Sequence, residues 1–330
     1  MKGGENPLQQ AIALCRDEMA QVDRCIVEQL RSEIAMIPAV GRYIVGSGGK
    51  RLRPLICLLA ARLFGYRGRE HIPPAVVIEF IHTASLLHDD VVDAARERRG
   101  TPSANGVWGN QASVLVGDYL FSRAFQMLVQ AGDMTVLSLM SDTTNALAEG
   151  EVLQLSRTFH IEMCEAECLE VIERKTAVLF RAAAGVGALV AGRDTATVTR
   201  MAEYGMALGV AFQLMDDALD YTAERARAGK PVGHDLEEGK ITLPLIHAMA
   251  RDPELRARVE AIAENDGYRD EEERDWVRRR VLHHGGDVVC MERAADYARR
   301  AARAVEAVDG DPTVTGLLQR LAGFAARRDH

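Results

Sequence analysis

The sequence lacks the features that mark secreted and membrane-spanning proteins. Its six cysteines do not follow the spacing of a disulfide framework, which fits a reducing compartment. The first residues, Met1 to Asn6, have no apolar core of the kind found in signal peptides. A long run of small and apolar residues, 182–192, falls far short of the ~20 residues that a transmembrane helix needs. We therefore expect a soluble, cytoplasmic protein without a membrane anchor.

Common catalytic signatures are also missing. The chain has no Ser-His-Asp spacing, nucleophile elbow, Walker phosphate loop or dinucleotide-binding glycine motif. The segment Gly46 to Lys50 is rich in glycine, but it lacks the spacing and the preceding strand of a phosphate-binding loop. A net charge of -8, from 40 basic and 48 acidic residues, argues against a general nucleic-acid-binding protein. No protein nucleophile is evident, so we look for chemistry that does not need one.

Strand signals are absent as well, because no β-branched run alternates with a period of two. Apolar residues recur instead at helical spacing. Length alone would favour two domains, but no Pro/Ser-rich linker or low-complexity stretch divides the chain. We predict one all-α domain over 1–330, in which long helices bury their apolar faces in a central bundle. The predicted helical stretches are 7–45, 54–63, 75–95, 112–129, 138–155, 165–192, 195–221, one that starts at 241–244, and 253–328 with breaks at glycine.

What the chain does contain is a cluster of carboxylates at the end of an apolar helix. Asp89, Asp90 and Asp93 follow a run of mostly apolar residues, and Asp89 and Asp93 are neighbours on one helix face. Like charges at this spacing repel each other, and a helix C-terminus disfavours anions. The cluster is therefore unfavourable unless a cation occupies it. Aspartate oxygens are hard ligands that suit Mg2+, which substrate phosphates commonly complete.

The same arrangement occurs a second time in the chain. Asp216 and Asp220 are again four residues apart at the end of an apolar helix, with Asp217 beside them. A single cluster of this kind is explained equally well as a solvated helix end and as a metal site. Two copies behind two apolar helices favour a metal site.

Basic residues lie near both acidic clusters in the sequence. They are Lys50, Arg51 and Arg53, then Arg98 and Arg99, then Lys175, and finally Lys230 and Lys240. Any one of them is most often a solvated surface charge. Lys175 fits that interpretation less well, because its helical neighbours three and four residues away are apolar. Together with Mg2+, such side chains hold a diphosphate and neutralise it as it leaves. The pattern indicates metal-triggered loss of a diphosphate, which generates a carbocation.

A second kind of metal site is an alternative at one place only. His160, Cys164 and Cys168 form a stripe at helical spacing, which could bind a soft metal. Three such residues on a charged helix are more often incidental, because a closed zinc site needs four ligands.

These motifs resemble those of the trans-isoprenyl diphosphate synthases, most closely the bacterial octaprenyl-type long-chain members. The resemblance covers almost the whole chain, from about Leu8 to the last helix. The matching segments are Gly48 to Pro54, His82 to Asp93, Arg98 to Gly100, Gly117 to Leu120, Glu149 to Glu151, Lys175-Thr176, Phe212 to Asp220, and Gly239 to Pro244. The resemblance implies an isoprenoid-synthase-type bundle of long helices around a central cavity, Mg2+ as cofactor, and a homodimer.

The resemblance also implies roles for individual residues. Asp89 and Asp93, with Asp216 opposite, would bind Mg2+ on the allylic diphosphate, and the supporting carboxylates would be Asp90, Asp217 and Asp220. The clamp on that diphosphate would consist of Arg98, Lys175, Gln213 and Lys230, with Lys240 nearby. Isopentenyl diphosphate would be held without metal by Lys50, Arg53, His82 and Arg99. Thr176 would face the developing allylic cation.

The implied reaction is repeated head-to-tail condensation of isopentenyl diphosphate onto an allylic diphosphate such as farnesyl diphosphate. The chain grows down the helix face below Asp89, where Ala84 and Ser85 are small. A deep pocket and a long product follow, and octaprenyl diphosphate for quinone side chains, such as that of ubiquinone, is the expectation. The residues that could close the bottom of this pocket are Phe121, Phe125 and Met127. They are equally well explained as ordinary core residues.

The sequence also allows other interpretations. The product could be of medium length, from geranylgeranyl to heptaprenyl. A class I terpene cyclase shares the fold but does not need the isopentenyl site. A non-catalytic partner subunit would have lost aspartates, and a structural bundle would have no diphosphate-dependent activity. One departure from the family pattern is His234, where relatives usually have an acidic residue. Contact with the membrane surface during product release is a further expectation.

Overall fold

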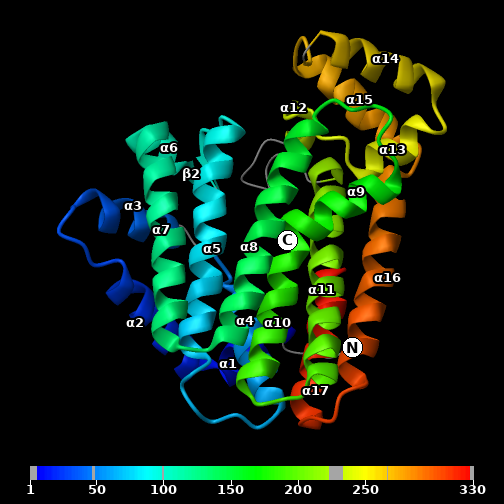
Figure 1. Ribbon diagram of the computed structural model, residues 1–330. Helices are drawn as coiled ribbons and strands as arrows, with labels where there is room; N and C mark the ends of the chain where they lie inside the picture. The colour runs from blue at the N-terminus through cyan, green and yellow to red at the C-terminus, as the bar shows by residue number, and fades with distance from the viewer. Residues whose placement is uncertain (1–5, 47–48, 99, 223–232, 266, 328–330) are drawn as a thin grey trace. The chain divides into compact units, whose positions relative to one another are not determined.

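The structure is a computed structural model that describes residues 6–46, 49–98, 100–222, 233–265 and 267–327. These residues are almost entirely helical (Figure 1). The only sheet among them is a two-residue ladder in which Glu97–Arg98 (β1) pairs antiparallel with Thr101–Pro102 (β2). The all-α prediction is confirmed.

The chain forms two compact units, each assembled from separate stretches. The first unit consists of Met1–Thr144, Leu179–Gly205 and Arg303–Leu321. The second consists of Asn145–Val178, Met206–Ala302 and Ala322–His330. The expectation of a single domain over 1–330 stays a prediction.

The first unit contains the N-terminal helices and the helix of the first acidic motif. Its helices are α1 (Pro7–Leu14), α2 (Arg16–Gln29), α3 (Met36–Gly46), α4 (Leu52–Leu63), α5 (Ile72–Val92), α6 (Ala104–Trp108), α7 (Asn110–Ala131) and α10 (Val178–Val190). α5 packs chiefly against α7 and also against α4 and α2. Most of its residues are buried, from Ile72 to Asp90, which explains why it is apolar on nearly every face.

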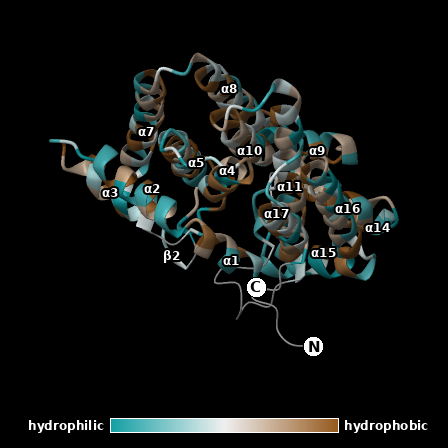
Figure 2. Cartoon of the chain, turned by 90° about the horizontal axis from the view of Figure 1, so that it is seen from below, coloured by the Kyte–Doolittle hydropathy of each residue, from teal (hydrophilic) through white to brown (hydrophobic). Residues whose placement is uncertain are grey.

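Apart from α10, whose first residue Val178 belongs to the second unit, four helices contribute residues to both units. They are α8 (Met134–Ser156), α11 (Thr195–Thr222), α16 (Gly286–Glu306) and α17 (Pro312–Ala325). The buried residues of α16 include Cys290, Ala294, Ala298, Ala301 and Val305, which recur every three or four positions. Figure 2 shows hydrophilic and hydrophobic residues on the same helix. No described helix is both long and apolar enough to cross a bilayer.

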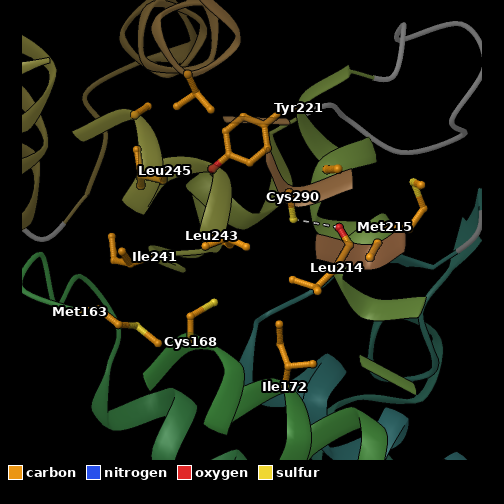
Figure 3. Close-up of a cluster of buried hydrophobic side chains, with 14 of the residues drawn as sticks. Met163, Cys168, Ile172, Leu214, Met215, Tyr221, Ile241, Leu243, Leu245 and Cys290 are labelled. Carbon is orange, nitrogen blue, oxygen red and sulfur yellow. Dashed lines mark hydrogen bonds between the residues drawn. The ribbon is translucent and has the colours of Figure 1, made fainter. Parts of the chain in front are cut away.

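The second unit contains the shorter helices of the C-terminal half. They are α9 (Glu165–Ile172), a π-helical turn η1 (Glu173–Ala177), α12 (His234–Glu237), α13 (Leu243–Met249), α14 (Pro253–Glu264) and α15 (Glu271–His283). Figure 3 shows its core, in which Leu214, Met215 and Tyr221 meet side chains of α9, α13 and α16. Cys290 donates its thiol hydrogen to the carbonyl of Leu214, with 3.1 Å between sulfur and oxygen.

Two predicted stretches differ from the structure in continuity. The predicted helical stretch 7–45 is three helices, and one of its breaks falls at 31–35. There the Ser32 hydroxyl accepts a hydrogen bond from the Ile34 backbone N–H at 3.1 Å, which closes a local turn in place of a helical bond. Between the predicted helices 75–95 and 112–129 the structure has the β1–β2 ladder and α6. Ser103 caps α6 by accepting a hydrogen bond from the Gly106 N–H at 3.3 Å.

Candidate active site

The first acidic motif closes α5 in the first unit. Asp89 and Asp90 lie in the last turn, and Asp93 follows as its C-cap, donating its backbone N–H to the Asp89 carbonyl at 2.8 Å. Ala94 then turns the chain with φ of 49°, a left-handed conformation. Asp89 and Asp93 are half-buried and Asp90 is buried. The motif therefore lies at a helix end, as the sequence predicts.

Asp90 differs from its two neighbours because its carboxylate is already engaged. The Arg98 guanidinium donates to Asp90 Oδ1 from Nε at 2.8 Å and approaches the same oxygen from Nη2 at 2.6 Å. Asn105 donates its side-chain amide to the Asp90 backbone carbonyl at 2.9 Å. The side chain of Asp90 thus holds Arg98, one of the predicted diphosphate-binding residues.

Gly117 allows α7 to approach α5 beside this motif. A Cβ atom at residue 117 would lie 2.3 Å from His88 Nε2, which is closer than real contacts allow. His88 Nε2 lies 3.2 Å from the Val114 carbonyl oxygen and 3.4 Å from Asp118 Oδ1. The Gly117-Asp118 pair therefore packs against the residue next to Asp89.

Two of the predicted isopentenyl-binding residues lie together. Arg53 Nη1 and His82 Nε2 are 3.1 Å apart, and the Arg53 guanidinium carbon lies 4.5 Å from the centre of the Phe180 ring. Lys50 is exposed, and Arg99 lies outside the described residues. Phe180 was not predicted, since it sits in an apolar helix and no sequence signal indicates which cation its ring faces.

The second acidic motif lies on α11 in the second unit. Asp217 is buried and accepts a hydrogen bond from the Gln213 side-chain amide at 2.8 Å. Gln213 Oε1 in turn accepts from the Thr176 hydroxyl at 2.9 Å. Because the amide nitrogen points to Asp217, the amide oxygen points to Thr176, so the orientation of Gln213 is fixed from both sides.

Burial and neighbouring carboxylates disfavour the ionised form of the acids around this motif. Burial raises the pKa of Asp217 to about 7, assisted by the charges of Asp216 and Asp220 and opposed by Gln213 and Lys240. Burial and the charges of Asp220 and Asp217 also raise the pKa of Asp235 well above its usual range. Asp235 was not among the predicted site residues. A cation close to this group of acids would relieve their repulsion.

Asp220 is engaged with the start of α12. Its Oδ1 accepts from the His234 N–H at 3.1 Å and its Oδ2 from the Asp235 N–H at 3.0 Å, so the carboxylate caps this short helix. The His234 ring lies 3.4 Å from Glu238 Oε1, and Glu238 also pairs with Lys240. His234, which departs from the family pattern, thus contacts Glu238, the acid that pairs with Lys240.

Lys175 and Thr176 lie within the π-helical turn η1, and Lys175 Nζ is 2.5 Å from Glu151 Oε2. They help to line a cavity of about 120 Å³ in the second unit, together with Gln213, Asp217 and Lys240. The structure thus brings five predicted site residues to one cavity, whereas Lys230 lies outside the described residues. The cavity's apolar wall, which includes Met163, Val171 and Ile241, was not predicted.

The donor set suits a hard cation better than a soft one. Within the described ranges, no group of three or more His, Cys, Asp or Glu side chains is arranged to hold a metal ion alone. Mg2+ fits such a site, because it keeps several waters and takes further oxygens from substrate phosphates. The stripe of His160, Cys164 and Cys168 is poorly suited to a soft metal, because Cys164 is exposed and burial raises the pKa of the Cys168 thiol, which disfavours the thiolate that binds metal.

Comparison with known proteins gives consistent results over most of the chain. The family model described as polyprenyl synthetase matches residues 34–279. The chain is 51% identical to octaprenyl diphosphate synthase of Escherichia coli K12 over 236 residues, which are 72% of this chain and 73% of that protein. It is 39% identical to a geranyl-diphosphate-specific all-trans-nonaprenyl-diphosphate synthase of Rhodobacter capsulatus, over 90% of this chain and 91% of that protein.

A solved structure shows the same likeness in three dimensions. The crystal structure of a polyprenyl synthase from Caulobacter crescentus CB15, complexed with calcium and isoprenyl diphosphate, superposes with a TM-score of 0.94 at 40% identity. The superposition covers 99% of this chain and 100% of that one. The predicted isoprenoid-synthase-type all-α fold is thereby confirmed.

Proposed function

Because this chain belongs to the polyprenyl synthetase family, and is therefore a prenyltransferase, we propose that it is a long-chain trans-polyprenyl diphosphate synthase. It condenses isopentenyl diphosphate repeatedly, head to tail, onto an allylic diphosphate in a Mg2+-dependent reaction. The observation that supports this most directly is the cavity lined by Lys175, Thr176, Gln213, Asp217 and Lys240. It combines two ammonium groups, a polar relay and a buried acid, which suits a diphosphate accompanied by metal.

Both acidic motifs take part in the proposed reaction. Asp89, Asp93 and Asp216 would bind the Mg2+ ions that accompany the allylic diphosphate. Bound Mg2+ polarises the diphosphate and neutralises the charge that develops on it. Asp217 and Asp220 support the second motif, the former through Gln213 and the latter by fixing α12.

The cationic residues hold the leaving group. Arg98, kept in place by Asp90, and Lys175 contact the allylic diphosphate, and Lys230 and Lys240 add further positive charge. The carbon–oxygen bond of the allylic diphosphate then breaks, and its electron pair leaves with the diphosphate. Thr176 donates its hydroxyl hydrogen to Gln213, so the oxygen lone pairs are directed away from Gln213 and are available to the allylic cation.

Isopentenyl diphosphate is bound by Arg53 and His82, with Lys50 and Arg99. Arg53 and His82 share a contact of 3.1 Å, which pre-orients the guanidinium for a phosphate. The double bond of isopentenyl diphosphate attacks the allylic cation and a new carbon–carbon bond forms. The resulting cation loses a proton, with the released diphosphate as its base, and the lengthened chain enters the next cycle.

The product is proposed to be long, with octaprenyl diphosphate as the expected length and ubiquinone-type side chains as its use. Ala84 is fully buried and Ser85 half-buried, and neither is large enough to block a growing chain. The Phe121 ring lies 5.8 Å from that of His88, centre to centre, close to the acidic motif. The residue proposed to close the bottom of the pocket is therefore Phe125 or Met127, further along α7.

A direct assay tests this function. The protein is incubated with farnesyl diphosphate, isopentenyl diphosphate and Mg2+, and the dephosphorylated products are sized by chromatography. Long all-trans alcohols that disappear on chelation of the metal are the expected result. Products of geranylgeranyl to heptaprenyl length would make the enzyme a medium-chain synthase. Cyclic hydrocarbons without isopentenyl incorporation would indicate a terpene cyclase, and no turnover at all would overturn the proposal.

We also propose that the enzyme acts in the cytoplasm as a homodimer and touches the membrane surface only transiently to release its product. Exposed apolar side chains on α7, among them Leu115 and Val129, support an interface between two copies. Sedimentation equilibrium measures the mass in solution, and a monomer at micromolar concentration would contradict the dimer.

A further inference from the structure

The segment Glu149-Gly150-Glu151 on α8 matches the family but has no role in the proposed reaction. Gly150 lies directly against the π-helical turn η1. A Cβ atom at residue 150 would be 2.7 Å from the Lys175 backbone nitrogen and 2.8 Å from the Arg174 carbonyl carbon. The absence of a side chain at Gly150 therefore lets the backbone of α8 touch the turn that contains Lys175.

The two glutamates beside Gly150 make different ion pairs. Glu151 Oε2 lies 2.5 Å from Lys175 Nζ, and the two side chains are 29% and 19% exposed, which limits screening by water. Glu149 Oε2 lies 2.6 Å from Arg174 Nη1, but these side chains are 54% and 40% exposed. Arg174 has a second partner in Glu170 at 3.1 Å. The Glu151 pair therefore involves Lys175, which lines the cavity. The Glu149 pair lies at the surface, and its cation Arg174 has another carboxylate partner.

The π-helical turn gives this arrangement its significance. π-helical turns are rare, and single turns of this kind often occur at functional sites. Here the turn contains Lys175, which lines the cavity, and Thr176, which is held by Gln213 at 2.9 Å. Glu151 is the carboxylate that fixes the lysine end of this turn, as Gln213 fixes the threonine end.

We propose that Glu151 is a positioning residue that acts through Lys175. It holds the ammonium group beside the cavity before the allylic diphosphate binds. This inference rests on the proposed function. A lysine has a long side chain with many rotamers, and ordering it in advance removes that cost from the step in which the diphosphate leaves. Because charge on the diphosphate grows as the bond breaks, the effect of Glu151 falls on kcat more than on the KM for isopentenyl diphosphate.

A double-mutant cycle tests this assignment. The variants are Glu151→Ala, Lys175→Ala and the double variant, compared with the wild type by the rate of the first condensation. We expect Lys175→Ala to slow the reaction about 100- to 1,000-fold, as loss of one charge-stabilising donor does. Glu151→Ala should slow it about 10- to 100-fold through misplacement of the ammonium. The double variant should match Lys175→Ala, because Glu151 has nothing left to position.

Two further variants separate positioning from a general structural role. Glu151→Gln keeps an acceptor oxygen for Lys175 and should restore most of the rate. Glu149→Ala, one position from Gly150 on the other side, is the matched control and should leave kcat within about twofold, since exposed pairs contribute little. If Glu151→Ala melts below the assay temperature, Glu151→Leu replaces it in the cycle. Losses that multiply in the double variant, or a control as slow as Glu151→Ala, would overturn the assignment.

The outcome also distinguishes failure of this inference from failure of the proposed function. An inactive wild type would overturn the function and not the positioning role. In that case the same cycle is measured by calorimetric binding of pyrophosphate with Mg2+. Glu151→Ala should weaken binding only when Lys175 is present, and an equal loss without Lys175 would refute the inference.

Discussion

Asp90 and Arg98 form an ion pair in which one carboxylate oxygen, Oδ1, receives the guanidinium at both 2.8 Å and 2.6 Å. The side chain of Asp90 is fully buried and that of Arg98 is 20% exposed. Asp90 therefore holds the Arg98 guanidinium in place, whereas Asp89 and Asp93 are the proposed metal ligands. The three aspartates should respond differently to substitution.

Asp90→Asn should reduce both stability and turnover. A buried charged pair that loses one partner leaves the other uncompensated, which costs about 3 kcal/mol or more. The free energy of unfolding, measured with urea, should fall by about that amount. The turnover should fall because Arg98 is no longer held. An unchanged midpoint of unfolding would show that the pair contributes nothing to the fold.

Asp89→Ala should affect turnover strongly and stability little. Removing a half-buried carboxylate at a helix C-terminus relieves repulsion from Asp93 and from the helix dipole, so stability should change little. Turnover should be lost almost completely, because the residue is a proposed Mg2+ ligand. The comparison is made by melting temperature and by isopentenyl incorporation. Mg2+-dependent turnover close to that of the wild type would contradict the metal role.

Ala84→Tyr should shorten the product to a few isoprene units. Ala84 is fully buried on α5, five residues before Asp89, and an aromatic ring there would fill the path proposed for the growing chain. Overpacking should also cost about 1–3 kcal/mol of stability. Val288→Tyr, at a 51% exposed position of α16, is the control and should leave product length unchanged. Unaltered product length in a folded Ala84→Tyr enzyme would refute the pocket assignment.

Asp252 should link stability to pH. It caps α14 through the Leu255 N–H at 3.1 Å and accepts from Arg280 at 2.6 Å, and the Arg280 hydrogen bond holds its pKa well below the usual range. A lowered carboxyl pKa adds stability above the unfolded pKa of about 3.9, and this stability is lost as pH falls further. Asp252→Ala should cost at least about 1 kcal/mol at pH 7, as loss of a helix cap does.

The pH profile of that variant provides the check. The His284 ring also contacts Asp252, with 3.0 Å between Nε2 and Oδ2, so the difference between wild type and Asp252→Ala is measured with urea from about pH 5 downward. It should narrow below about pH 4, where the unfolded carboxyl takes up its proton. Asp275→Ala, which removes a more exposed carboxylate on α15 at 3.6 Å from Arg278, is a suitable control with a smaller expected effect. A stability difference that grows below about pH 4 would contradict the lowered pKa of Asp252.

The parts of the site that depend on local pattern were predictable from the sequence. Helices α5, α7 and α11 were expected within a few residues of their ends, because each has long apolar periodicity and a clear stop. Both acidic motifs lie at the helix ends where the spacing put them. The metal-binding roles of Asp89, Asp93 and Asp216 stay predictions.

The parts that depend on distant residues could not be predicted. The sequence shows apolar residues around Lys175, and its acidic partner Glu151 comes from another helix, α8. The π-helical turn has no signature in the letters of Glu173–Ala177, and the close approach of Gly150 to its backbone is a tertiary contact. The role of Arg278, which donates to the Tyr221 carbonyl at 3.0 Å behind the second motif, is likewise set by tertiary contacts.

The composition of the first unit has a consequence for biosynthesis. This unit combines the first 144 residues with Leu179–Gly205 and with Arg303–Leu321, close to the other end of the chain. A ribosome delivers residues in order, so the unit that contains Asp89 lacks its last stretch until residue 321 has been made. Until then, α5 and α7 lack the packing partners that this last stretch contributes to the unit. Chaperone demand should therefore persist until α17 has emerged and fall once it has.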